Sequence, residues 1–431
     1  MIKKKQLNIA IVGLGNIGSY LYQYLSKNKK KLRKKTNITP NVLYVSAKNK
    51  KKKRSFTISK SRWLKNYLKA ATEKDIDVVV ELIGGSDGAA KKLVYSALKN
   101  KKHVVTANKA LIAKHGDNLA RIAEKNNVNL EFEAAVCGGL PIVRSIKEGL
   151  IANNVSKVKG IFNGTSNYIL SSMDKNKISF KESLKNAQKL GYAESKPASD
   201  INGDDVSSKL KILTSLSFNT FINDNIHVEG ISEVDQEDIL NANKLGYKIK
   251  LLGISESINN KITQRVHPSL IKKNNFLASI DGVQNVVIVD GTPVGQSVIQ
   301  GEGAGPKATT SALISDISSI ARGNIKYPFS ISNNERKKLK SDSIQNKYFS
   351  AYIRLDVVDK HGVLSNITGF FAKNKVSIKR LIQNPFKSKR NSSIIIITHK
   401  SKEMNLRKII KQLSKKRYII KKPKLIRIEE E

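Results

Sequence analysis

Residues 7–18 read Leu7-Asn-Ile-Ala-Ile-Val12-Gly13-Leu-Gly15-Asn-Ile-Gly18, and this stretch decides the fold of the N-terminal part of the chain. The apolar run before Gly13 predicts a strand, and the amphipathic sequence after it, to about residue 25, predicts a helix. A Gly-x-Gly-x-x-Gly turn between a strand and a helix is typical of a dinucleotide-binding loop. Its first glycine permits the tight turn, its second lets the backbone approach a pyrophosphate, and its third allows the helix to pack closely on the strand.

The next hundred residues alternate strand and helix patterns. Strands are predicted at residues 42–46, 77–83, 103–106 and 128–132, and helices at 89–100 and 109–125. Residues 77–83 form a continuous apolar run with Glu81 inside it, which is typical of a strand covered on both faces. This alternation predicts an α/β fold with a doubly wound parallel sheet of the Rossmann type. The basic, Asn-rich residues 27–40 are predicted to form a surface loop.

The rest of the chain has two further characters. The middle part contains predicted helices at 180–190 and 206–216 and short strands at 248–255, 278–281 and 285–289, followed by a glycine loop and a helix at 309–322. Residues 348–431 read strand, turn, helix, strand, strand, helix, strand. We therefore expect four parts: a Rossmann domain of residues 1–135 that is completed by 302–325, an α+β catalytic domain of 136–301, a linker of 326–347, and a small α+β domain of 348–431.

The composition is strongly basic, with 78 Lys and Arg against 35 Asp and Glu in 431 residues, a net charge of +43. The lysines are spread along the whole chain, Trp occurs once, and no nucleic-acid-binding motif is present, so we expect a solvated surface and no nucleic-acid partner. A single Cys excludes a disulfide framework and fits a reducing compartment. No apolar run is long enough to span a membrane, so we expect a cytoplasmic protein.

The end of the second strand bears on the choice of cofactor. An acidic residue there would bind the ribose 2′-hydroxyl of NAD, but the sequence is Val45-Ser-Ala-Lys48-Asn, followed by five basic residues. Ser46 and Lys48 could accommodate a 2′-phosphate instead. The sequence therefore favours NADP and leaves NAD possible.

The candidate catalytic and substrate-binding residues occur in five segments: 105–109, 131–142, 162–168, 191–197 and 200–209. Asp205 and Lys209 are four residues apart on one predicted helix, so both can project into one cleft. Glu194 lies in the turn before this helix, and Lys109 lies just beyond the carboxyl end of a strand, where open α/β sheets bind ligands. Together they offer a proton donor and charged groups that can hold a small amino acid.

These five segments, in this order, resemble homoserine dehydrogenase over residues 7–325. The family interconverts L-homoserine and L-aspartate 4-semialdehyde with NAD(P) in the biosynthesis of threonine, methionine and isoleucine. The resemblance implies that Lys209 is the general acid/base, with Asp205 and Lys109 beside it at the substrate and nicotinamide. It implies that Glu194, Asp200 and Asp205 bind the substrate. The implied cofactor-binding residues are Gly13, Gly15, Asn16, Ile17, Gly18, Lys48, Thr106, Lys109 and Gly303.

The family also binds a monovalent cation, usually sodium, in the loop that begins at Glu133. Carried over, its ligands are Glu133, Val136, Gly138 and Leu140, an oxygen set that suits a hard cation. Cys137, in the same loop, is interpreted as a small buried filler. The chain departs from the family in having Lys196 where an acid usually precedes proline, and Ser199 where an acid is common.

Residues 348–431 resemble an ACT domain, a ferredoxin-like regulatory unit that binds amino acids. The turn Asp359-Lys-His-Gly362 has His361 where the family usually has proline. The resemblance implies L-threonine as an effector and a homo-oligomer; a purely structural dimerisation module is the alternative. Two other readings of the whole chain remain: a different Rossmann amino-acid dehydrogenase, and a basic nucleic-acid-binding protein.

Overall fold

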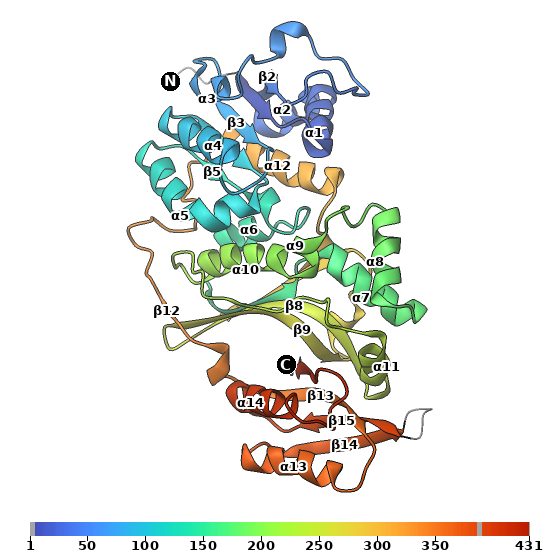
Figure 1. The fold of residues 1–431 in the computed structure, drawn as a ribbon. Helices are drawn as coiled ribbons and strands as arrows, with labels where there is room; N and C mark the ends of the chain where they lie inside the picture. The colour runs from blue at the N-terminus through green and yellow to red at the C-terminus, as the bar shows by residue number, and fades with distance from the viewer. Residues whose placement is uncertain (1–4, 386–389, 431) are drawn as a thin grey trace.

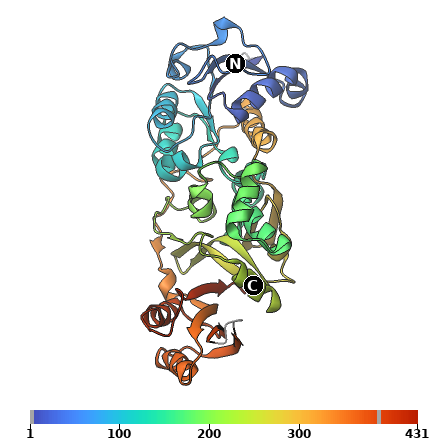
Figure 2. The same cartoon turned by 45° about the vertical axis from the view of Figure 1, so that its right-hand side comes forward.

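The computed structural model describes residues 5–385 and 390–430. The chain forms three parts stacked along one axis, with the N-terminal part at one end and the C-terminal part at the other (Figure 1, Figure 2). Residues 1–4, 386–389 and 431, which belong to the first and last predicted domains, lie outside the described residues. None of the helices in the described ranges is long and apolar enough to cross a membrane.

The first part contains a five-stranded sheet in the order β2-β1-β3-β4-β5, and all neighbouring strands are parallel. Its strands are β1 (Gln6–Val12), β2 (Thr39–Ser46), β3 (Val78–Glu81), β4 (His103–Thr106) and β5 (Leu130–Glu131). Its helices are α1 (Asn16–Lys27), α2 (Lys29–Thr36), α3 (Lys69–Thr72), α4 (Ala89–Lys99) and α5 (Lys109–Lys125). The strand order reverses between β1 and β3, and ligands bind at such a switch point.

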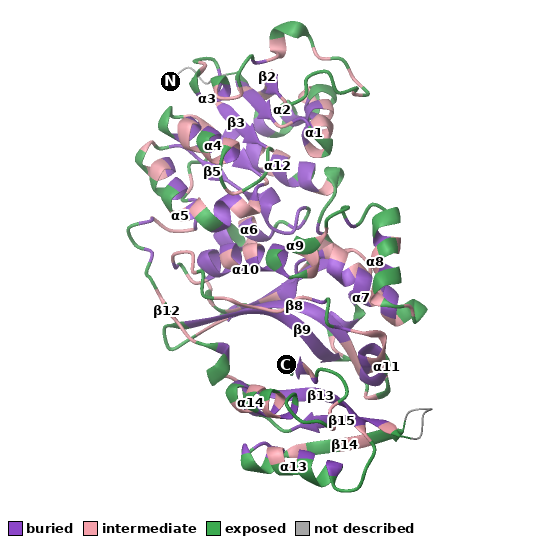
Figure 3. Ribbon diagram, in the orientation of Figure 1, coloured by how far each residue is buried: buried purple, intermediate pink, exposed green. Residues whose placement is uncertain are grey.

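Both faces of this sheet are covered because its strand residues alternate between two cores. Ile9 and Val80 pack on one side with α1 and with α12 (Pro306–Ala321), which returns from far along the chain. Ala10 and Val79 pack on the other side with α4. The prediction of a buried, doubly wound parallel sheet is confirmed, and Figure 3 shows its strands in the buried colour.

The predicted surface loop at residues 27–40 is wrong, because α2 occupies most of it. The sequence Lys-Lys-Lys-Leu-Arg-Lys-Lys-Thr has good helix formers but no apolar stripe, so the helix signal was hidden. Only Leu32 and Thr36 are buried in α2.

The second part is a layer of helices on a mixed sheet in the order β11-β10-β6-β8-β9. The strands are β6 (Asn154–Ile161), β7 (His227–Val228), β8 (Tyr247–Ile258), β9 (Lys261–Lys272), β10 (Gln284–Thr292) and β11 (Gly295–Glu302). The helices are α6 (Ile142–Arg144), α7 (Gly164–Asn176), α8 (Phe180–Lys189), α9 (Ala198–Ile201), α10 (Asp204–Ser217) and α11 (Gln236–Lys244). The predicted strand at 278–281 is wrong: Phe276–Ser279 is a 3-10 helix whose Leu277 and Ala278 pack beneath the sheet.

The third part has β13 (Tyr348–Val358), α13 (Val363–Lys373), β14 (Ile378–Pro385), β15 (Asn391–Thr398), α14 (Glu403–Leu413) and β17 (Lys424–Ile428), with the two-residue strand β16 (Ser401–Lys402) pairing β13. The sheet order β17-β13-β15-β14 is that of a ferredoxin-like βαββαβ unit, as predicted. β17 also pairs in parallel with β9, through Arg427 opposite Ser269 and Ile428 opposite Leu270. The sheets of the second and third parts are therefore continuous.

Residues 326–347, the predicted linker, pack along the first two parts. Arg336 is fully buried and donates to Asp117 of α5, to the Ser215 hydroxyl and to the Thr220 carbonyl. Downstream, β12 (Lys340–Ser341) pairs with β9. This segment therefore ties α5 to the C-terminal end of α10.

Candidate functional site

The glycine turn has the geometry expected of a phosphate-binding loop. Gly13 has φ +108°, and a Cβ on it would lie 2.3 Å from the Leu82 carbonyl oxygen. A Cβ on Gly18 would lie 2.0 Å from the Gly13 carbonyl oxygen, so a larger residue there would push α1 off the strand. Gly15, by contrast, has no atom within 4 Å of the corresponding position. Gly13 and Gly18 are therefore packed against the protein, whereas the backbone at Gly15 is open to a ligand.

Two adjoining cavities lie over this turn at the switch point. The larger has a volume of about 770 Å³, and the second, of about 400 Å³, lies between the glycine turn and the start of α12. Of the predicted cofactor residues, Gly13, Gly15 and Lys48 line the larger, and Gly15, Asn16, Ile17 and Gly18 line the second. The basic residues of the larger cavity are Lys48, Lys50, Lys52, Arg54 and Lys65, and no acid is among its lining residues. An open glycine backbone beside a basic wall fits a dinucleotide phosphate.

Thr106 is buried beneath this cleft and does not line either cavity. Its hydroxyl donates to Glu81 at 2.6 Å, and the same carboxylate accepts the backbone N–H groups of Ile83 and Gly84. Thr106 also accepts the N–H of Asn108, the residue that caps α5. The structure therefore gives Thr106 a role in shaping the loops around the cleft.

A buried cluster of charges lies where α5 of the first part meets α10 of the second. The Asp205 carboxylate is 2.7 Å from Lys109 Nζ through one oxygen and 2.7 Å from Lys209 Nζ through the other. Lys209 also donates to the Phe162 carbonyl at 2.6 Å. Asp205 and Lys209 are both buried, whereas the Lys109 side chain is 39% exposed. The predicted i,i+4 pair therefore exists, and Lys109 joins it from another part of the chain.

Asn163 completes the cluster, although its role was not predicted from the sequence. Its amide donates to Asp200 at 2.7 Å and to Asp205 at 2.8 Å, while its carbonyl oxygen caps α7 by accepting the N–H of Ser166. The only signal in the sequence is its place in the segment 162–168. Because Asn163 holds both carboxylates, it fixes Asp200 next to the Asp205–Lys209 pair.

The electrostatics of the cluster keep Asp205 and Lys209 charged. Burial favours the neutral form of both groups, but Lys209 and Lys109 hold the pKa of Asp205 well below its usual range. Asp205 in turn outweighs the burial of Lys209 and raises the pKa of that ammonium. Asp200 differs, because burial dominates and raises its pKa. In this cluster Lys209 is protonated and Asp205 is ionised, and the pKa of the neighbouring Asp200 is higher than that of Asp205.

The structure does not connect Glu194 to this cluster. Glu194 is exposed in the loop between α8 and α9, and its backbone carbonyl accepts from Gln188. The two departures from the family pattern are exposed as well: Lys196 lies in the same loop, and Ser199 lies in α9. This loop leads directly into α9, which contains Asp200.

The predicted cation loop lies next to the cluster. Glu133 is buried, and its two carboxylate oxygens accept the backbone N–H groups of Val143 and Arg144. Burial raises the pKa of Glu133 to about 7. Positive φ angles at Cys137 and Gly138 fold the loop against Gly303, since a Cβ on Gly138 would lie 2.5 Å from the Gly303 carbonyl oxygen. A buried carboxylate with two further lone pairs, beside a carbonyl-rich turn, fits a hard cation.

Cys137 is fully buried, and burial raises its pKa to about 11. A buried thiol that is not ionised at neutral pH is not a nucleophile. The interpretation of Cys137 as a filler agrees with this geometry.

The turn Asp359–Gly362 borders a cavity of about 630 Å³ in the third part. Gly362 has φ +81° at the N-terminus of α13, and Gln383 and Ser392 lie across from it. The cavity is separate from the clefts of the first two parts.

A glycine-turn cleft at the switch point of a parallel sheet, next to a buried Lys–Asp pair on a second domain, defines an NAD(P)-dependent dehydrogenase. Family models agree: residues 13–133 match "Homoserine dehydrogenase, NAD binding domain", residues 141–318 match "Homoserine dehydrogenase", and residues 351–417 match "ACT domain". The chain belongs to the homoserine dehydrogenase family.

Individual relatives support the same assignment. The homoserine dehydrogenase of Helicobacter pylori is 39% identical over 99% of this chain and 100% of its own length. The crystal structure of a homoserine dehydrogenase from Thiobacillus denitrificans is 34% identical, covers 99% of both chains and has a TM-score of 0.92. A hyperthermophilic archaeal homoserine dehydrogenase in complex with NADPH is 23% identical and shares the fold, with a TM-score of 0.62 over 74% of this chain and 100% of its own.

Proposed function

We propose that the chain reduces L-aspartate 4-semialdehyde to L-homoserine with NADPH, with Lys209 as the proton donor. The observation that supports this role is the set of contacts made by Lys209 Nζ. An ammonium has three N–H bonds, and two of them are used by the Phe162 carbonyl and by Asp205. The third is available to a substrate oxygen.

The reduced nicotinamide, when bound, supplies the hydride that adds to the aldehyde carbon. Lys209 donates a hydrogen bond to the aldehyde oxygen, stabilises the negative charge that develops there and transfers its proton to it. Asp205 keeps Lys209 protonated and oriented. In the reverse direction, neutral Lys209 removes the hydroxyl proton of homoserine.

The substrate is held by charges around this proton donor. We assign Asp200, and Glu194 from the preceding loop, to the α-amino group of the substrate, and Lys109 to its carboxylate side. Lys109 is half-exposed and bonded to Asp205, and Asn108, directly before it, lines the smaller of the two cavities over the glycine turn, which supports a place for Lys109 between cofactor and proton donor. The Asn163 amide donates to both Asp200 and Asp205 and so fixes the two carboxylates relative to each other.

For the cofactor we propose NADP over NAD, with Ser46 and Lys48 at the 2′-phosphate. The larger cavity has a basic lining without an acid to bind a free 2′-hydroxyl. Gly13, Gly15, Asn16, Ile17 and Gly18 would hold the pyrophosphate, with Gly303 at the nicotinamide side; we assign Thr106 the supporting role described above.

We further propose a sodium site formed by Glu133 and the backbone carbonyls of Val136, Gly138 and Leu140.

We propose that the chain divides into four parts: a Rossmann domain of residues 1–135 with 302–325, a catalytic domain of 136–301, a linker of 326–347 and an ACT domain of 348–431. The ACT domain is proposed to bind L-threonine at the Asp359–Gly362 turn, in a cytoplasmic homo-oligomer that serves threonine, methionine and isoleucine biosynthesis.

The proposal is tested by mixing the pure chain with L-homoserine and either NADP or NAD and following the absorbance of the reduced cofactor. We expect a higher kcat/KM with NADP. Equal or higher kcat/KM with NAD would refute the cofactor assignment, and no turnover with either would refute the reaction. Unchanged rates with and without millimolar threonine would remove the effector assignment.

A further inference from the structure

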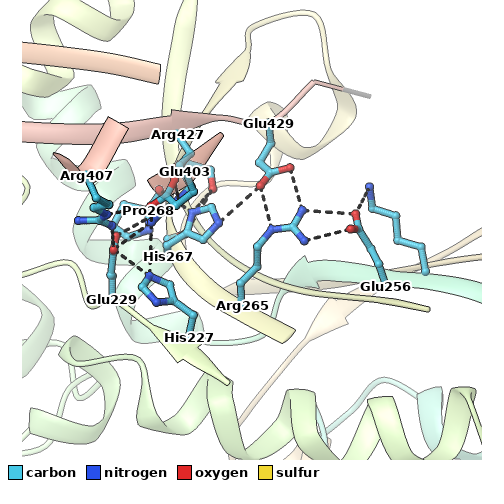
Figure 4. A network of polar contacts seen from close by, with 12 residues as sticks. His227, Glu229, Glu256, Arg265, His267, Pro268, Glu403, Arg407, Arg427 and Glu429 are labelled. Atoms are coloured by element: carbon cyan, nitrogen blue, oxygen red, sulfur yellow. Dashed lines mark hydrogen bonds and ion pairs between the residues drawn. The ribbon is translucent and has the colours of Figure 1, made fainter. Parts of the chain in front are cut away.

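The ACT domain is joined to the catalytic part by buried ion pairs around β17 and β9 (Figure 4). Arg427 of β17 is central to them, with a fully buried side chain. Its guanidinium donates to Glu403 of the same domain, and to both oxygens of Glu229 at 2.9 and 3.1 Å. Glu229 belongs to the catalytic part, directly after β7.

Glu229 receives further partners from both sides of the joint. Arg407 of α14 donates to it, and His227 lies 2.9 Å from the same oxygen. Burial alone would favour a neutral Glu229, but His227 and Arg427 hold its pKa well below the usual range. Glu229 is therefore an anion held by His227 of the catalytic part and by Arg427 and Arg407 of the ACT domain.

The backbone after Glu229 contacts the active-site helices. The N–H of Glu229 donates to the Val266 carbonyl on β9, and the N–H of Ile231 donates to the Ile201 carbonyl at 2.8 Å. Ile201 is the last residue of α9 and directly follows Asp200. Only Gly230 therefore separates Glu229, which pairs with Arg427, from Ile231, which bonds to the substrate-site helix.

The packing at this contact leaves no slack. A Cβ on Gly230 would lie 2.2 Å from the Ile201 carbonyl oxygen, and one on Gly203 would lie 3.1 Å from Val228. Gly203 precedes α10, which contains Asp205 and Lys209. A shift of residues 228–231 therefore moves α9 or the start of α10, since well-packed interiors transmit displacements.

We propose that Arg427 is a positioning residue for the active site: by holding Glu229, it fixes α9 and sets Asp200 against Asn163. The inference rests on the proposed role of Asp200 in holding the substrate. In this proposal the C-terminal strand of the ACT domain supports the substrate site. A conformational change in the ACT domain would act on the catalytic residues through Glu229 and α9.

Arg427 could also act only by holding the two domains together. A second buried arginine at the same joint, Arg354, provides the matched control for that role. Arg354 of β13 is as buried as Arg427 and pairs with Asp235, Glu237 and Asp238 of the catalytic part. Those acids cap and begin α11, whose Asn243 bonds to Asp174 near the far end of α7 from Asn163. Within the described residues, Arg354 bonds to the start of α11 and to Asp356 and makes no hydrogen bond to α9 or Glu229, so its removal breaks an inter-domain ion pair without removing a direct contact to α9.

The experiment compares the full-length variants Arg427→Gln and Arg354→Gln by steady-state kinetics, with NADPH affinity measured by fluorescence titration. We expect R427Q to raise the KM for L-homoserine by about tenfold or more, because small misplacements of binding groups are costly. Its NADPH Kd should stay within about twofold, and R354Q should leave the homoserine KM within about twofold, as distant sites act independently. Native amide exchange at Ile231 should be faster in R427Q than in R354Q.

A homoserine KM in R427Q within about twofold of wild type, or equal increases in both variants, would overturn the proposal. So would a parallel loss of NADPH affinity, which marks general loosening. If R427Q does not fold, Arg407→Gln decides: it removes a half-exposed donor to the same Glu229, and an unchanged homoserine KM refutes positioning. Asp200→Asn separates the two proposals, because an unchanged KM there refutes the role of Asp200 and not the coupling.

Discussion

Replacement of Lys209 by methionine removes the proposed proton donor with little change in volume. The variant loses the two hydrogen bonds of Nζ, to the Phe162 carbonyl and to Asp205, and lacks the group that we propose protonates the substrate oxygen. Asp205 keeps Lys109 and Asn163 as partners, so it is not left unpaired. We therefore expect a folded protein with an intact cofactor cleft.

The size of the effect follows from the role. A positioned general acid contributes about 10²–10⁴-fold, so kcat should fall by about 10³-fold, which corresponds to about 4 kcal/mol. The Phe162 carbonyl loses its donor inside the protein, which should lower the free energy of unfolding by about 1–3 kcal/mol. The NADPH Kd should not change, because Lys209 does not line the dinucleotide cavities.

Lys250 provides the control for the loss of a buried ammonium. It is buried on β8 and donates to the Ile280 carbonyl and to Asp281 at 2.7 Å, the same pair of partner types as Lys209. Lys250→Met should lose similar stability and retain its kcat. The assay is homoserine oxidation and semialdehyde reduction by both variants at saturating NADP(H), with urea unfolding in parallel. A kcat for K209M within about tenfold of wild type, or an equal fall for K250M, would refute the assignment.

Three further predictions concern the cofactor, the glycine turn and acid stability. Lys48→Ala should raise the KM for NADP by about tenfold and leave that for NAD unchanged in the same absorbance assay, since one charged hydrogen bond is lost; equal changes would contradict the 2′-phosphate role. Gly18→Ala, whose Cβ would lie 2.0 Å from the Gly13 oxygen, should lose NADPH binding by fluorescence and about 1–3 kcal/mol of stability, and wild-type affinity would refute the packing role. Arg265 outweighs the burial of Glu256 and lowers the pKa of that carboxyl from 4.5 to about 2. The ionised Glu256 therefore contributes up to about 3 kcal/mol to the free energy of unfolding above pH 4.5, and this contribution is lost as the pH falls toward 2. In Glu256→Gln the free energy of unfolding, measured in urea, should fall less between neutral and acid pH than in the wild type, and an equal fall in both proteins would refute this role of Glu256.

The parts of the fold that depend on residues close together in the sequence were predictable from it. The glycine turn, the buried run at Val78–Glu81 and the strand–helix order of the ACT unit depend on hydrophobic periodicity and turn residues. The helix α2 was missed because its residues have helix propensity without an apolar face. The spacing of Asp205 and Lys209 predicted that their side chains could meet, and they do at 2.7 Å.

Contacts made between distant segments were not predictable in the same way. Asn163 bridges two aspartates 37 and 42 residues away, and nothing in its own neighbourhood announces them. The pairing of β17 with β9 is equally non-local, and a lysine-rich C-terminal sequence gives no sign that Arg427 is fully buried. Such features depend on how the domains dock, which a single sequence does not encode in any local pattern.

The charge of +43 gains a different meaning from these contacts. With 78 basic residues and 35 acidic ones, a cation without a carboxylate partner is the ordinary case and says little about function. Carboxylates that hold cations across the boundary between two parts of the chain are more informative. Asp205 gathers Lys109 and Lys209 at the proton-donor site, and Glu229 gathers Arg407 and Arg427 at the ACT joint. Because burying an ion is costly unless its partners are well placed, the buried Asp205 with its two lysines and the buried Arg427 with its two carboxylates mark these sites more clearly than the total charge does.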